Sequence, residues 1–169
     1  MTEITVREFC RDDAGPTAQI FYDAVHEGAA SHYSVKQLNA WVGKVPNTDW
    51  WFRRLSPQTV LVAEIGGRTV GFMTLDEEAQ EIDLAFVAPD FIGHGVAWHL
   101  YRDLIGIAVE KGISTLRAHA SFLARPFFER QGWSVITEQN LHVRGISLTN
   151  FLMERDLQLT LPISGGYQK

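Results

Sequence analysis

EIDLAFVAPDFIGHGVAWHLYRDL, residues Glu81–Leu104, joins a β-rich run to a long helical pattern through a glycine-rich turn, and it decides the fold. Pro89 ends the strand, because proline cannot continue a ladder. Apolar residues then recur every four positions from Val96 to Ala108, as on one face of a helix. A second β-rich run, Thr115–Ala120, follows. Residues 81–120 therefore predict a strand–helix–strand unit with parallel strands and a right-handed crossover.

The segments on either side of this unit extend the sheet. Gly66-Gly67 joins two β-rich runs, Thr59–Ile65 and Arg68–Leu75, and a two-residue glycine link is typical of a hairpin. Before them we expect a strand over about residues 3–9 and three short helices, with Asp12 or Asp13, Ser34 and Thr48 as N-caps. After residue 120 we expect a short helix containing Pro126 and two strands, Trp133–Val143 and Ile146–Asp156. The sequence predicts an α/β fold with a mixed sheet of six to seven strands and helices on both faces. We expect a single domain over residues 1–169, with a loose tail after about residue 161.

Composition limits the class of protein. The chain has 169 residues, 46% of them hydrophobic and 21% charged, which is typical of a globular domain. Cys10 is its one cysteine, and the N-terminus has no apolar run of signal-peptide length, so a cytoplasmic protein is expected. No stretch is apolar enough for a membrane span, and the net charge of −5 argues against a nucleic-acid partner.

The turn between strand and helix has the chemistry of an anion site. Glycines at 93 and 95 allow backbone conformations that other residues avoid, so that amides at the start of the helix can point outward together. Such a group of amides binds phosphate with help from the helix dipole. The turn lacks the Gly-Lys-Ser/Thr ending of a P-loop and the third glycine of a dinucleotide fingerprint. The simpler alternative is that both glycines only shape the turn.

Two motifs resemble the GNAT superfamily of acyl-CoA N-acyltransferases. The run VAPDFIGHGVAWHLYRDL is similar to its acetyl-CoA loop, [QR]-x-x-G-x-[GA] after a strand ending V-x-P, with Ile92 in place of Gln or Arg. The run ARPFFERQGW at 124–133 resembles the second signature, A-x-x-F-Y-E-x-x-G-F. The resemblance implies a GNAT-like fold whose central parallel strands are splayed and hold acetyl-CoA as co-substrate. It implies that the cofactor contacts Ala85, Phe86, Val87, Ile92, Gly93, His94, Gly95, Val96, Ala97, Ser121 and Phe128.

The resemblance also implies candidates for proton transfer. Glu81 falls where some GNAT enzymes have a glutamate base, and Asp83 shares its strand face because side chains alternate. Both could instead be solvated strand residues. His119, near the end of the second parallel strand, suits a proton shuttle or a structural hydrogen bond. Phe128 takes the place of the family's usual acidic tyrosine, so the usual proton donor is missing. Ser121 replaces a common asparagine and could bind the cofactor or cap the helix.

The first helices are where the family builds its acceptor pocket. His26, Tyr33 and Trp51 are candidates for lining it, and Trp41 and Trp50 belong to the same aromatic segment; all could equally be core residues. The histidines show no ligand spacing, so no metal is expected. We expect an N-acetyltransferase that moves acetyl from acetyl-CoA to a primary amine of a small molecule or protein, and the acidic residues favour a cationic acceptor. The alternative is an acyl-CoA sensor without turnover. The final hairpin offers an edge for a homodimer.

Overall fold

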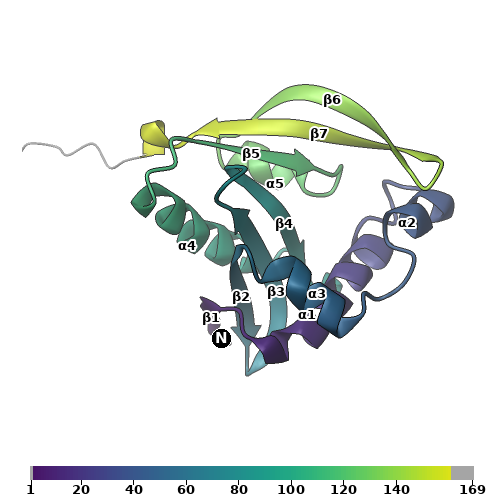
Figure 1. Ribbon diagram of the computed structural model, residues 1–169, viewed down its shortest axis with the longest axis horizontal. Helices are drawn as coiled ribbons and strands as arrows, with labels where there is room; N and C mark the ends of the chain where they lie inside the picture. Colours follow the sequence, from purple (N-terminus) through teal and green to yellow (C-terminus); the bar gives the residue numbers. More distant parts are fainter. Residues whose placement is uncertain (1, 161–169) are drawn as a thin grey trace, which may run out of the picture.

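The computed structural model describes residues 2–160, in which helices cover both faces of a seven-stranded sheet (Figure 1). The predicted loose tail lies outside the described residues. The strands are β1 (Ile4–Glu8), β2 (Thr59–Ile65), β3 (Arg68–Asp76), β4 (Glu81–Val87), β5 (Thr115–Ala120), β6 (Ser134–Val143) and β7 (Ile146–Asp156). The helices are α1 (Ala14–Asp23), α2 (Val35–Trp41), α3 (Thr48–Leu55), α4 (Val96–Glu110) and α5 (Arg125–Arg130). A π-helical turn, Ala24–Gly28, extends α1 and had no signal in the sequence.

The strand order is β1-β2-β3-β4-β5-β7-β6, and β4 and β5 are parallel while all other neighbours are antiparallel. The α/β fold class, the strand number and the parallel pair confirm the sequence prediction. The parallel pairing covers only Glu81 opposite Arg117 and Ile82 opposite Ala118. Beyond these pairs the two strands diverge, so the sheet splits into β1–β4 and β5–β7–β6 (Figure 1).

Local sequence explains most element boundaries. Gly66 and Gly67 both have positive φ, +59° and +78°, as a primed hairpin turn requires. Ser34 caps α2 through the amide of Gln37, as predicted. The predicted cap of α3 was wrong: Asn47, not Thr48, accepts hydrogen bonds from the amides of Asp49 and Trp50. Asparagine is the stronger cap, and it displaces the helix start by one residue.

Two of the three apolar clusters lie on opposite faces of the sheet, and the third, which includes Val25, Leu38 and Leu148, lies between the π-helical turn, α2 and β7. Met73, Leu100, Leu104 and Phe128 belong to the core under α4 and α5. Trp51, Leu55 and Phe72 belong to the core under α1 and α3. Residues 2–160 include no helix with both the length and the apolar character of a membrane crossing.

Candidate active site

The turn before α4 presents a row of free amides. Gly93 and Gly95 both have φ +84°, a conformation that side chains with a Cβ rarely adopt, and Gly95 is the N-cap of α4. Within the described chain, hydrogen bonds engage none of the amides of Gly93, Gly95 and the first three helical residues, Val96–Trp98. The dipole of this fifteen-residue helix places positive potential at the same point. The turn therefore fits a phosphate or pyrophosphate group.

The strand β4 presents a second set of free amides. A bulge sets Asp83 and Leu84 opposite Thr74, whose Oγ1 accepts a hydrogen bond of 3.0 Å from the amide of Leu84. Past the bulge, the amide of Ala88 bonds to Val70 O at 2.8 Å and faces β3. Since amides alternate along a strand, those of Ala85 and Val87 face the opposite way, into the splay. Neither has a partner strand there, because β5 pairs only with Glu81 and Ile82.

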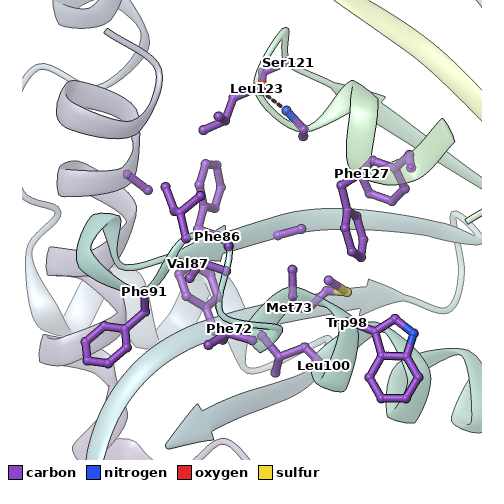
Figure 2. A pocket seen from close by; sticks show the side chains of 18 of the residues that line it. Phe72, Met73, Phe86, Val87, Phe91, Trp98, Leu100, Ser121, Leu123 and Phe127 are labelled. Atoms are coloured by element: carbon purple, nitrogen blue, oxygen red, sulfur yellow. Dashed lines mark hydrogen bonds between the residues drawn. The ribbon is translucent and has the colours of Figure 1, made fainter. Parts of the chain in front are cut away.

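A cavity of about 370 Å³ joins these two sets of amides. Figure 2 shows side chains from β3, β4, α4 and α5, among them Met73, Val87, Leu100 and Phe127, around the same space. Every predicted cofactor residue except His94 lines it, namely Ala85, Phe86, Val87, Ile92, Gly93, Gly95, Val96, Ala97, Ser121 and Phe128. The His94 side chain instead hydrogen-bonds to Ile92 O at 3.2 Å. The cavity has the dimensions of a small-molecule site.

Two residues at the α5 end of the cavity have structural partners as well. Phe128 is buried and packs edge-on against Trp133, with ring centroids 4.8 Å apart. Ser121 Oγ accepts a 3.1 Å hydrogen bond from the amide of Ala124, so it stabilises the turn before α5 while it also borders the cavity.

The predicted catalytic residues lie beside the cavity but not in its wall. Glu81 and His119 come together, with Oε2 and Nε2 3.9 Å apart, where β4 and β5 still pair. His119 Nδ1 lies 2.9 Å from Gln139 Oε1. Burial raises the pKa of Glu81, and of the nearby charges His119 opposes this most while Asp83 adds to it. A carboxyl group with a raised pKa beside an imidazole can take up and pass on a proton.

Asp83 has other partners. Its Oδ2 accepts a hydrogen bond of 2.8 Å from Gln58 and lies 2.8 Å from Arg54 Nη2. Asp83 shares a strand face with Glu81, as expected, but it is paired to α3.

Among residues 2–160, no three His, Cys, Asp or Glu side chains are grouped as metal ligands.

The predicted acceptor residues make structural contacts outside the cavity wall. His26 Nε2 lies 2.5 Å from Val42 O, and its ring stacks on Tyr22. Trp51 is buried and donates to Thr17 Oγ1 at 3.0 Å. Tyr33 donates to Thr149 O at 2.8 Å and accepts from the amide of Phe122 at 3.1 Å, and burial raises its pKa.

Other residues of the same segment do line the cavity. Trp41 borders it from α2, and Ala24 and Ala29 border it from the two ends of the π-helical turn. Trp41 stood in the aromatic segment noted in the sequence. The two alanines had no sequence signal, because small apolar residues near a helix end look like ordinary core.

Comparison with known proteins shows which family the chain resembles. The family model described as "Acetyltransferase (GNAT) domain" matches residues 29–155. An uncharacterized N-acetyltransferase of Escherichia coli (strain K12), YafP, is 36% identical over 153 residues, which cover 90% of this chain and 96% of that protein.

Solved structures share the fold. The crystal structure of a GCN5-related N-acetyltransferase from Rhodopseudomonas palustris superposes with a TM-score of 0.86 at 29% identity, over 92% of this chain and 98% of that one. The yncA protein of Salmonella typhimurium, a putative acetyltransferase solved with its cofactor acetyl-CoA, gives a TM-score of 0.70 at 20% identity, over 91% and 94% of the two chains. The match over residues 29–155 and the identity to YafP show that the chain belongs to the GNAT family of acetyltransferases.

Proposed function

We propose that this GNAT acyltransferase uses acetyl-CoA as acyl donor and a primary amine as acceptor. The observation that carries the proposal is the continuous cavity between the free amides at the start of α4 and the free amides of Ala85 and Val87. The first set would bind the pyrophosphate, and the second would hold the pantetheine arm and the thioester. Acetyl-CoA in the yncA structure, which has the same fold, supports this choice of donor.

The reaction follows from these positions. The amine nitrogen attacks the thioester carbonyl carbon, a C–N bond forms, and the C–S bond breaks. An amide of β4 pointing into the splay, that of Ala85 or Val87, would stabilise the negative charge that develops on the carbonyl oxygen. The amine proton would leave toward the Glu81–His119 pair. Glu81 and Ala85 are four residue steps apart along the strand, about 13 Å, so water must relay the proton.

The thiolate has no phenol to protonate it. Among the described residues, the cavity wall includes no tyrosine, cysteine or histidine, and the Tyr33 hydroxyl is held by two backbone groups outside it. We propose that CoA leaves as the thiolate. This is feasible because a thiol has an ordinary pKa of about 8.5.

A CoA-release assay tests the function. The protein is mixed with acetyl-CoA and, in turn, with small amines and peptides bearing a free N-terminus, and the free thiol is measured. Release that depends on an amine supports the proposal. Binding of acetyl-CoA in a melting scan without release for any amine would favour the acyl-CoA sensor.

A cytoplasmic location and a homodimer paired through the edge strand β6 stay predictions. Cell fractionation would test the location, and gel filtration would test the dimer.

A further inference from the structure

The cavity reaches both faces of the sheet, and its two ends differ in chemistry. The end under α4 has the free amides. The other end lies under the π-helical turn and α2, and we call it the acceptor end. Its walls are Phe72 and Phe86 from the sheet, Trp41 from α2, and Ala24 and Ala29. All five side chains are apolar or aromatic.

Charged groups are almost absent from the cavity wall. Among the described residues that line it, Arg130 of α5 is the one charged side chain, and it comes from the face opposite the acceptor end. The nearby carboxylates are engaged elsewhere, Glu81 with His119 and Asp83 with Arg54. The cavity therefore offers no carboxylate to a polycation, and a buried charge without a partner is costly.

The part of the cavity wall that faces the π-helical turn is also apolar. A Cβ on Gly28 would lie 3.3 Å from both Ile92 Cδ1 and Leu123 Cδ2, so these side chains pack against the π-helical turn. Ile92 occupies the position where the family pattern has Gln or Arg. Compared with that pattern, the cavity wall of this chain has an apolar side chain here in place of a polar one.

The aromatic walls have defined orientations. The Phe86 ring lies 6.3 Å from Trp41 at 57° and 5.9 Å from Phe72 at 35°. Phe21 packs edge-on behind Phe86 at 4.9 Å. Such walls present both ring faces and ring edges, which suit a flat aromatic guest. A single ammonium can also lie over a ring face, but several cannot be matched here.

We infer that the acceptor is a primary amine carried on an aromatic body without a second charge, as in an arylalkylamine. This rests on the proposed function and names its substrate class. The sequence had favoured a cationic acceptor because of the carboxylates at the site and the acidic chain. The inference narrows this to an acceptor with one cationic group, because neither Glu81 nor Asp83 lines the cavity.

The test compares amines of opposite character. CoA release is measured with tryptamine and 2-phenylethylamine on one side and with spermidine and kanamycin on the other. We expect kcat/KM to be at least about tenfold higher for the aromatic amines, the scale on which a shaped apolar pocket discriminates. Higher kcat/KM for spermidine or kanamycin would overturn the inference and leave the proposed function standing.

Variants locate the site. Trp41→Ala should raise KM for tryptamine about tenfold or more, with KM for acetyl-CoA unchanged, and Trp41→Phe should have a smaller effect. Trp50→Ala is the matched control, because Trp50 is 52% exposed and does not line the cavity. An unchanged KM for tryptamine in a folded Trp41→Ala protein would contradict the inference.

Calorimetry separates the two proposals. Tryptamine is titrated into the protein saturated with CoA, which needs no turnover. Binding without CoA release in the assay would refute the proposed function and support the inferred pocket. No binding of tryptamine, together with release by other amines, would refute the pocket alone.

Discussion

Gly95 has a left-handed backbone conformation and lies beside the free amides at the start of α4. We predict that Gly95→Asp abolishes acetyl-CoA binding, because a carboxylate there would repel the phosphates and occupy their space. A Cβ at this position meets nothing closer than His99 Nδ1 at 3.8 Å, so the chain should still fold. Calorimetry measures the affinity and circular dichroism the fold.

Gly67→Asp is the control for backbone strain. Gly67 also has positive φ, +78°, with open space around it, but it lies in the β2–β3 turn away from the cavity. Both variants should lose similar stability, and only Gly95→Asp should lose affinity. Normal affinity in Gly95→Asp would place the phosphate site elsewhere.

Glu81 gives a prediction about pH. Because burial raises its pKa, the carboxylate base forms at a higher pH than in a free glutamate, and turnover should rise with pH through that raised value. Glu81→Gln should lower turnover at neutral pH by at least about tenfold and remove this rise. Asp83→Asn is the comparison: it should lose the ion pair with Arg54 and, because the charge of Asp83 helps to raise the pKa of Glu81, move the rise to lower pH without removing it. Rates near wild type for Glu81→Gln would rule out Glu81 as the base.

The same group affects stability with a definite sign. Glu81 keeps its proton to a higher pH in the folded state than in the unfolded state. Its contribution to the free energy of unfolding therefore falls as pH rises from the ordinary glutamate pKa through the raised one. Denaturant titrations of wild type and Glu81→Gln across that range should converge at low pH. Above the raised pKa, the wild type should be less stable than Glu81→Gln, because it lacks the stability that protonated Glu81 supplies.

Residue roles were the hardest part to predict from sequence. The glycine turn was accessible because glycine spacing reports backbone conformation directly. The residues of the acceptor end could not be predicted, since the sequence does not distinguish a tryptophan in the core, such as Trp51, from one that borders the cavity, such as Trp41. Only the packing of α1 against α3 puts Trp51 against Thr17, while Trp41 borders the cavity.

At the scale of elements, the close approach of α4 to β3 holds the amide row in place. A Cβ on Gly71 would lie 2.8 Å from Val96 Cγ1 and 3.2 Å from Phe86 O. We predict that Gly71→Ala lowers the free energy of unfolding by about 1–3 kcal/mol, the usual cost of overpacking. It should also weaken acetyl-CoA binding, because relief of the clash must move the start of α4.

Gly106→Ala is the matched control within α4. A Cβ there meets nothing within 4 Å, so the helix should gain up to about 1 kcal/mol from the better propensity of alanine. Urea titration measures both variants. Equal stability of Gly71→Ala and wild type would show that α4 and β3 separate without cost.

Elements were largely predictable because each has a local cause. Alternation and helical spacing revealed the strands and helices, and Gly66-Gly67 revealed the hairpin. The bulge at Asp83 and Leu84 was not visible, because it depends on the register between β3 and β4. The π-helical turn was equally hidden, since its helical hydrogen-bond shift leaves no mark in composition.

At the scale of the whole molecule, the splay divides the sheet. Its two parts, β1–β4 and β5–β7–β6, are joined within the sheet by two residue pairs between β4 and β5. The sequence could predict parallel strands but not their divergence, which entered through resemblance to the family. The ligand proposed here would lie in that gap and contact β4, α4 and the turn before α5.

Acetyl-CoA should therefore act as a clamp between the two parts of the sheet. A ligand at a hundredfold excess over its Kd adds about 2.7 kcal/mol, which raises Tm by about 5–11 °C for a chain of this size. Hydrogen exchange should slow at residues 85–87, 93–98 and 121–131, while β1, at the far edge, should change only as far as global stability does. Gly95→Asp should show neither effect. A higher Tm with protection outside these segments would place the ligand at another site, and an unchanged Tm at millimolar acetyl-CoA would remove it as the donor.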